Sequence, residues 1–372
     1  MIFISIVFLT ESCGQLNHRH EQSKFKDKNP EHSDIKFSDK KEKADDNFIS
    51  IIAAGDVMPG SNYPSGYSLP PDDGKYLFDS VKYLIGTADI NFCNLEGTLL
   101  DSGGKPKKCN TPDNCVSFRI PEHYGGYLKD AGFDLVSLAN NHSNDMGEDG
   151  KISTIKTLEK YSINYAGYID HPVTVFEKNG VTFGFTAFAP NTGTQSLNNL
   201  SNAVKVISDL RKKCKILIVS FHGGAEGYSA QRVSGNKEIF LGEDRGNVYE
   251  FAHAVIDAGA DIVLGHGPHV PRAMEIYKGK IIAYSLGNFC TYGKFSLSGP
   301  QGIAPLIKIF INTSGNFVKG NIYSFKQVMR GMPVPDEERT AVKLIKSLTE
   351  KDFPEGDLLI SDEGEIIVRR SE

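Results

Sequence analysis

The chain has 372 residues, of which 40% are hydrophobic and 37 are glycine, with a formal net charge of -5. This composition excludes a disordered or fibrous protein and allows a sizeable hydrophobic core. The acidic balance argues against nucleic-acid binding, which requires a basic face to neutralise phosphates.

The chain begins with an apolar run, Met1 to Leu9, that is too short to span a bilayer and has the length of a signal-peptide core. No positively charged segment precedes it. Cys13, followed by glycine, resembles the end of a bacterial lipoprotein signal, in which the cysteine is lipidated. The alternative is an inert cysteine in a frayed terminus, because Thr10 and Glu11 match a lipobox poorly. As a signal, residues 1–13 would make the protein exported, with a lipid anchor in the membrane of the cell envelope.

Residues 14–47 are charged and polar with few large apolar side chains, so we expect a disordered tether. A folded domain follows over residues 48–330, and residues 331–372 are expected to form a helix over 336–348 and a hairpin that pack on it. Cys109 and Cys115 flank a proline-containing turn that could bring their sulfurs together, so we predict a disulfide between them.

Short apolar runs alternate with amphipathic stretches beyond residue 48, which is the pattern of parallel strands joined by helices in an α/β fold. Six strands are expected to end directly in polar turns: 48–54, 88–93, 133–139, 215–221, 260–264 and 280–284. Four helices are expected from apolar residues at three- and four-residue intervals: 75–85, 122–131, 150–161 and 247–258. A further strand over 183–188 is expected to begin a second sheet or an antiparallel extension.

Side chains that can bind metal follow these strands: Asp56, Glu96, Asn141, His142, His222, His266 and His269. Ligands in open α/β sheets bind beyond the carboxyl ends of the strands, so we expect these side chains to converge. Their mixture of oxygen and nitrogen atoms, without cysteine, suits Mn, Fe or Zn. One or two such ions could polarise a phosphoryl oxygen and generate hydroxide near neutral pH.

The ordered set of motifs resembles the bacterial capsule-synthesis proteins of the CapA type, which are related to the poly-γ-glutamate synthesis protein PgsA. The resemblance covers about residues 48–330. It is carried by Gly55-Asp56-Val57-Met58, Asn94-Leu95-Glu96-Gly97, Ala139-Asn140-Asn141-His142, His222-Gly223-Gly224-Ala225-Glu226, Gly265-His266-Gly267-Pro268-His269 and Tyr284-Ser285-Leu286-Gly287-Asn288-Phe289. This family looks like a branch of the calcineurin-like metallophosphoesterases, which implies a four-layer α/β/β/α sandwich.

The resemblance also implies a role for each candidate: Asp56 as the first-motif aspartate, Glu96 as a bridging carboxylate, Asn141 as the ligand amide, His142 as the catalytic imidazole that protonates a leaving group, and His222, His266 and His269 as metal ligands. Asn140 and Glu226 are expected to support these ligands. Asn288 either orients a ligand or caps a loop, and we favour the loop. Met58 departs from the active phosphoesterases, which have histidine at this place, so one metal position is a ligand short.

Each of these residues also has a structural interpretation, because Asp and Asn commonly cap turns and a histidine at a strand end is often only hydrogen-bonded. Two classes of function therefore stay open. One is a metal-dependent hydrolase acting on a phosphoester or on an anionic capsule polymer such as poly-γ-glutamate. The other is a non-catalytic subunit that binds or exports the polymer within a membrane-bound capsule synthesis complex.

Overall fold

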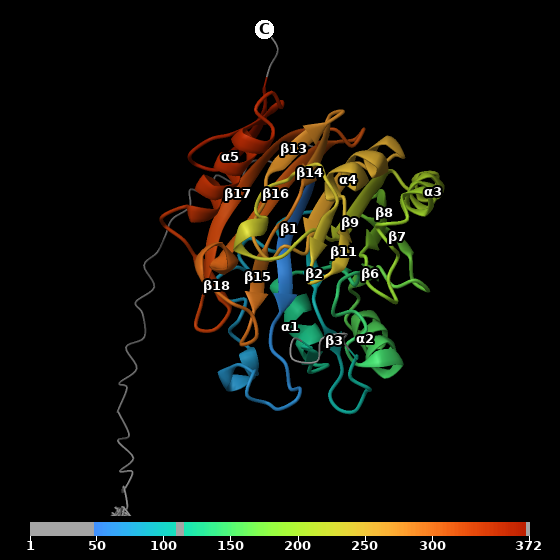
Figure 1. Cartoon of the computed structure of the whole chain (residues 1–372), viewed down its shortest axis with the longest axis vertical. Coiled ribbons are helices and arrows are strands. Elements are labelled where there is room, and N and C mark those ends of the chain that lie inside the picture. The colour runs from blue at the N-terminus through green and yellow to red at the C-terminus, as the bar shows by residue number, and fades with distance from the viewer. Residues whose placement is uncertain (1–47, 109–114, 370–372) are drawn as a thin grey trace, which may run out of the picture. The chain divides into compact units, whose positions relative to one another are not determined.

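The computed structural model describes residues 48–108 and 115–369 (Figure 1). Contacts divide the chain into Met1–Ala44 and Asp45–Glu372, and all of the following concerns the second unit. The predicted signal segment 1–13 with Cys13, the tether 14–47 and Cys109 lie outside the described residues. The Cys109–Cys115 disulfide therefore stays a prediction. Within the described ranges, no helix combines the length and the apolar character needed to cross a membrane.

The larger sheet has ten strands, and its central strand is β1 (Phe48–Met58). β1 pairs in parallel with β2 (Ile90–Leu95) and antiparallel with β16 (Ile303–Asn312). The strand order is β19-β20-β17-β16-β1-β2-β5-β6, with β15 on β1 and β18 on β17. The remaining strands of this sheet are β5 (Leu135–Ser137), β6 (Asn164–Ala166), β15 (Asn288–Thr291), β17 (Phe317–Val328), β18 (Met332–Pro335), β19 (Leu358–Ile360) and β20 (Glu365–Val368).

The second sheet has six strands in the order β13-β14-β12-β9-β8-β7. Its strands are β7 (Val173–Lys178), β8 (Val181–Phe188), β9 (Ile216–His222), β12 (Ile262–His266), β13 (Met274–Tyr277) and β14 (Lys280–Ala283). β8 pairs in parallel with β9 and antiparallel with β7, which confirms the predicted strand over 183–188 in a second sheet. Two small ribbons complete the strands: β3 (Thr98–Leu99) with β4 (Arg119–Ile120), and β10 (Glu238–Phe240) with β11 (Glu243–Gly246).

Alternating apolar side chains place the two sheets face to face. Along β1, Ile51 and Ala53 belong to the core that also contains Ile218 of β9, whereas Ile52 and Ala54 belong to the core on the opposite face. A strand side chain alternates between faces with a period of two, so such a strand must be covered on both sides. The outer cores contain the helices, and the layer order is α/β/β/α. This confirms the predicted four-layer sandwich.

The helices occupy the two outer layers and one edge. α1 (Tyr124–Ala131) and α2 (Gly147–Lys160) cover the larger sheet, and α3 (Leu200–Arg211) and α4 (Val248–Asp257) cover the smaller one (Figure 1). α5 (Thr340–Asp352) contributes to the core between the sheets. Short 3₁₀ turns are formed by η1 (Pro71–Gly74), η3 (Tyr228–Ala230) and η4 (Gly299–Gly302).

The predicted helix over 75–85 is wrong. This segment is a series of turns after η1, with hydrogen bonds such as Leu77 N to Gly74 O and Leu84 N to Val81 O. Its apolar side chains are nevertheless buried against the larger sheet. The three- and four-residue spacing of apolar residues therefore identified the buried side chains correctly. Consecutive turns closed by i to i+3 hydrogen bonds produce the same spacing without the continuous i to i+4 hydrogen bonds of an α-helix. The other three predicted helices are confirmed, with ends shifted by up to three residues.

Residues 331–372 extend the larger sheet as well as packing on it. β18 and β20 both pair with β17, and the predicted hairpin is β19 with β20. The helix begins at Thr340 rather than at Asp336, because the Asp336 carboxylate accepts a hydrogen bond from the Thr340 amide at 2.8 Å and so lies before the first turn.

Candidate metal centre

The carboxyl ends of strands from both sheets meet at one place. Asp56 lies near the end of β1 and pairs in register with Asn288, the first residue of β15. In the other sheet, His222 ends β9 and lies in register with His266, which ends β12. Parallel strands of one sheet have their carboxyl ends at the same edge of that sheet. In this fold the two packed sheets bring these edges, and the polar side chains on them, to the same end of the sandwich.

The Asp56 carboxylate is fully buried among polar neighbours. His266 Nδ1 lies 3.0 Å from Oδ1, His269 Nδ1 lies 3.0 Å from Oδ2, and Asn94 Nδ2 donates to Oδ1 at 2.9 Å. Burial alone would raise the pKa of Asp56, but the hydrogen bonds and charges of the two histidines outweigh it and hold that pKa well below its usual range. Asp56 is therefore an anion that joins the two sheets.

His269 has left-handed backbone geometry, with φ at 57°, which is strained for a residue with a side chain. Its Nδ1 also lies 3.2 Å from Asn288 Oδ1, and its Nε2 lies 3.7 Å from Glu96 Oε1. Burial lowers the pKa of His269, but the negative charges of Glu96, Asp56 and Glu226 raise it overall to about 10. Without a metal, a protonated His269 supplies the positive charge that these carboxylates require.

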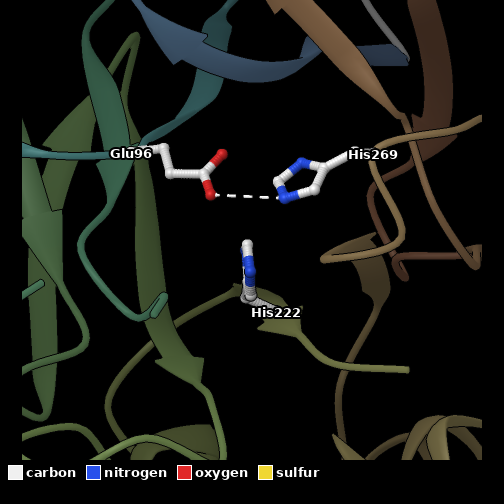
Figure 2. Close-up of side chains that lie close together, drawn as sticks. All are labelled: Glu96, His222 and His269. Atoms are coloured by element: carbon white, nitrogen blue, oxygen red, sulfur yellow. Dashed lines mark ion pairs between the residues drawn. The ribbon is translucent and has the colours of Figure 1, made fainter. Parts of the chain in front are cut away.

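Glu96, His222 and His269 form the cluster that can hold a metal (Figure 2). Their ligand atoms lie within 4.8 Å of one another, and all three residues are buried. Figure 2 shows the carboxylate and the two imidazoles directed toward one common space. Glu96 directly follows β2 of the larger sheet, whereas His222 ends β9 and His269 follows β12, both strands of the smaller sheet.

Several buried polar atoms of the candidate ligands lack a hydrogen-bond partner among the residues that the structure describes. They are both carboxylate oxygens of Glu96, Nε2 of His222, Nε2 of His266 and Oδ1 of Asn141. Buried polar atoms are almost always satisfied, because leaving one unpaired costs about 1–3 kcal/mol. Carboxylate, amide oxygen and imidazole nitrogen are also the donors that a borderline divalent ion accepts. The residues present therefore fit a divalent metal.

Burial shifts the pKa of two cluster residues toward their neutral forms. It raises the pKa of Glu96 well above its usual value, although the positive charge of His269 opposes that shift, and the charges of Asp56 and Glu226 raise this pKa further. Burial also lowers the pKa of His222 well below its usual value, which keeps the imidazole neutral and able to donate its lone pair. A bound cation would favour the ionised form of Glu96 and the neutral form of His222 together.

Asn140 connects the strand ends of the larger sheet. Its side-chain amide donates to Asn94 Oδ1 at 3.1 Å and to the Leu95 carbonyl at 2.9 Å, and its Oδ1 accepts from the His142 amide at 3.0 Å. Asn94 in turn contacts Asp56 and lies 3.4 Å from His222 Nδ1. These bonds fix the positions of the neighbouring ligand candidates.

His142 lies beside the cluster in a second polar chain. Its Nδ1 lies 2.7 Å from Asp145 Oδ2, and Lys107 Nζ lies 2.7 Å from the other oxygen of Asp145. The His142 Nε2 faces Glu96 Oε1 at 3.9 Å. Lys107 also donates to the Asn141 carbonyl at 2.9 Å. Because Asp145 engages Nδ1, Nε2 is the ring atom left for proton exchange at the cluster.

The sequence profile described as "Bacterial capsule synthesis protein PGA_cap" matches residues 50–292, which is more than half of the chain and includes every candidate ligand. The chain belongs to this family. Among its relatives, the capsule biosynthesis protein CapA of Bacillus anthracis is 30% identical over 260 residues, covering 65% of this chain and 59% of that protein. The PGA biosynthesis protein CapA of Bacillus subtilis (strain 168) is 27% identical over 260 residues, covering 66% and 63%. The chain thus spans less than two thirds of the length of either relative.

Similar solved structures include a hypothetical protein from Thermus thermophilus, with a TM-score of 0.46 and 16% identity over 75% of this chain and 100% of that one. The 5'-nucleotidase precursor from the same organism has a TM-score of 0.40 and 11% identity over 78% of this chain and 56% of that one. Likenesses of this size do not bear on activity.

Three other residues singled out in the sequence occupy different places in the structure. Asn288 begins a strand instead of capping a loop, and its Oδ1 faces His269. Glu226 approaches the same nitrogen of His269 as Glu96 does, with Oε2 at 3.9 Å from Nε2. Met58 is buried in the apolar core of the outer layer, so it offers nothing to the cluster.

Four residues that contact the site were missed by the sequence reasoning: Asn94, Lys107, Asp145 and Arg245. Asn94 belongs to the same motif as Glu96, and Asp145 follows His142 by three residues, so local spacing could have suggested both. Lys107 and Arg245 lie far from any motif in sequence. Only the tertiary structure brings them to the site.

Proposed function

We propose that this chain is a metal-dependent hydrolase that acts in the production of an anionic capsule polymer, such as poly-γ-glutamate. The observation that carries the proposal is the buried cluster of Glu96, His222 and His269, in which both Glu96 oxygens and His222 Nε2 have no hydrogen-bond partner within the part of the chain described. Family membership and the name of the Bacillus anthracis relative support the link to capsule synthesis, and the name of the Bacillus subtilis relative, a PGA biosynthesis protein, supports the choice of polymer.

The protein residues would divide the work between binding and proton transfer. Glu96, His222 and His269 would hold the ion, and Asp56 would orient His266 and His269 through their Nδ1 atoms. A Mn, Fe or Zn ion bound there would polarise the substrate and lower the pKa of a bound water. His142 would accept a proton from the attacking water at Nε2 and then donate it to the leaving group.

Asp145 would hold His142 in the tautomer that this step requires. A hydrogen bond from Nδ1–H to the carboxylate leaves the lone pair of Nε2 available. Burial of His142 lowers its pKa, although Asp145 opposes that shift, so the imidazole would be neutral when the substrate arrives. Lys107 would neutralise Asp145 and keep its carboxylate in place.

The metal content of the purified full chain tests this proposal. Mass spectrometry should find about one Mn, Fe or Zn ion per chain, or two if the site is binuclear. Glu96→Gln and His222→Ala should lose the metal, and His253→Ala should keep it, because His253 pairs with Glu275 at 3.0 Å in a similar imidazole–carboxylate contact away from the cluster. Hydrolysis of bis(4-nitrophenyl) phosphate and of a γ-glutamyl polymer would then define the scissile bond.

A non-catalytic subunit that binds or exports the polymer is the second candidate. The burial of Met58 among apolar side chains favours it, since active phosphoesterases have a metal-binding histidine at that place. A double variant with His222 and His266 changed to alanine distinguishes the two. If this variant still restores capsule in a deletion strain, the catalytic proposal is wrong.

We further propose that the protein is exported and acts at the cell envelope, held to the membrane by lipidated Cys13 and working with a membrane-bound capsule synthesis complex. The apolar run before Cys13 and the polar segment after it support this placement. Incorporation of a clickable fatty acid that disappears in Cys13→Ser would agree with it, and unchanged incorporation would contradict it.

A further inference from the structure

Two arginines are almost fully buried beside the metal cluster, and they are used very differently. Arg272 has all of its donor nitrogens occupied: Nε by the Ala230 carbonyl, and Nη1 and Nη2 by the Glu238 carboxylate at 2.8 Å and 2.6 Å. Arg245 makes one such bond, from Nη1 to Glu226 Oε1 at 2.6 Å. Its Nε and Nη2 are buried without a hydrogen-bond partner in residues 48–108 and 115–369.

The unused donors of Arg245 are a matched pair. Nε–H and Nη2–H lie along the same edge of a guanidinium and point in the same direction, which is the geometry that binds two oxygens of one carboxylate or phosphate. A buried arginine that serves only the fold is expected to resemble Arg272, with every donor satisfied. In Arg245, by contrast, the edge formed by Nε and Nη2 has no hydrogen-bond partner among the described residues.

Arg245 also lies against the residues that would hold the metal. Its backbone carbonyl accepts from the Gly224 amide at 2.8 Å, two residues after His222. Its partner Glu226 presents the other oxygen to His269 Nε2 at 3.9 Å.

Gly224 makes room for the saturated arginine. A Cβ at this position would lie 2.9 Å from Arg272 Nη1, and the residue has a positive φ of 86°. The absence of a side chain therefore lets the Arg272 guanidinium pack against the backbone that follows β9.

We propose that Arg245 binds an oxyanion of the substrate, a carboxylate or a phosphate, through Nε and Nη2 while the reacting part of the substrate meets the metal cluster. This inference rests on the proposed function, because it assumes that substrate reaches the cluster. It assigns the substrate class: a molecule with an anionic group next to the bond that reacts. The Glu226 carboxylate holds the guanidinium in position by occupying the opposite corner, Nη1.

Binding of two probes to the full chain tests this assignment. Inorganic phosphate and γ-glutamylglutamate are titrated calorimetrically into manganese-loaded wild type, Arg245→Lys and Arg272→Lys, after metal content and thermal unfolding have been measured for each. Lysine keeps the charge but loses the paired donors. Arg245→Lys should keep its metal and bind the probes about tenfold or more weakly, whereas Arg272→Lys should bind them as the wild type does. If only one of the two probes binds, it identifies the oxyanion: inorganic phosphate indicates a phosphate and γ-glutamylglutamate a carboxylate.

A second measurement avoids any variant that fails to fold. In nitrogen-15 spectra of the unaltered protein, the Nε–H resonance of Arg245 should shift on adding a probe and that of Arg272 should not. Equal affinity in Arg245→Lys, or no shift of the Arg245 resonance with either probe, overturns the proposal. Failure of the wild type to bind metal would contradict the proposed function instead, and the Arg245 resonance can still be followed in that metal-free protein.

Discussion

Glu96 gives the sharpest test of the metal centre, because removing it should change stability in opposite directions with and without metal. In the metal-free protein its two buried oxygens have no hydrogen-bond partner among the described residues, and the His269 imidazole lies 3.7 Å away. Methionine has a similar length and no need for a partner. We therefore expect Glu96→Met to raise the free energy of unfolding of the metal-free chain by about 1–3 kcal/mol.

Metal should reverse this order. A ligand present at about 100 times its dissociation constant stabilises the folded state by about 2.7 kcal/mol, and this gain requires the intact site. The wild type should gain that amount with manganese, and Glu96→Met should gain little because one of its ligands is gone. His269 keeps a carboxylate partner in the variant, since Asp56 Oδ2 remains at 3.0 Å from Nδ1.

Guanidinium unfolding followed by circular dichroism measures both effects. Each protein is unfolded once with a chelator and once with excess manganese, and His253→Ala serves as a variant with a similar imidazole–carboxylate pair removed elsewhere. The reasoning is refuted if Glu96→Met is less stable than the wild type in chelator and gains as much from manganese as the wild type does. In that case Glu96 would have a structural role in the apo fold.

Three further changes test the proton-transfer chain, a carboxylate at a helix start and the core. Asp145→Asn should lower kcat by about 100-fold with unchanged metal content, because His142 loses the partner of its Nδ1; loss of metal instead would show a structural role. Burial raises the pKa of Asp336, but hydrogen bonds from Thr340 outweigh burial, so the pKa in the folded chain lies below that in the unfolded chain. The ionised carboxylate therefore stabilises the fold above the unfolded pKa, and this stabilisation is lost as the pH falls through the folded pKa. Asp336→Ala should therefore destabilise the chain by about 0.5–2 kcal/mol at pH 7 and by much less near pH 2, as urea unfolding would reveal; an equal loss at both would contradict this. Phe92→Ala should cost about 3–5 kcal/mol in thermal unfolding, since this side chain is fully buried between the sheets, and a loss below 1 kcal/mol would contradict the layer assignment.

The strands and most candidate ligands can be predicted from the sequence because both depend on the local order of apolar and polar residues. An apolar run followed by a polar residue, as at Asp56 and His222, indicates a buried strand that ends at a sheet edge, and the structure places both residues there. Periodicity failed at residues 75–85, where turns bury the same apolar face without a helical ladder. The spacing of apolar residues predicts which side chains are buried, but it does not predict the backbone hydrogen bonds of the segment.

The contacts that depend on tertiary packing could not be predicted. Lys107 pairs with Asp145, which is distant in sequence, and Arg245 reaches Glu226 from a ribbon that has no strong strand pattern. The second sheet was inferred mainly from family resemblance, since no local signal states which strands pair. Long-range partners of buried charges require the fold itself.

The position of the cluster between the sheets links metal binding to the stability of the whole domain. Asp56 and Glu96 are supplied by the larger sheet, and His222, His266 and His269 by the smaller one, so neither sheet has a complete site. Apolar packing and the Asp56 contacts join the two layers at this end of the strands. An ion bound by Glu96 and His222 would add a direct bond between the layers, and it would favour the packed arrangement over any in which the sheets separate. Metal should therefore protect backbone amides of β2 and β9 from hydrogen exchange more than those of the outer helices α1 and α3, and uniform protection would mean that the ion does not join the sheets.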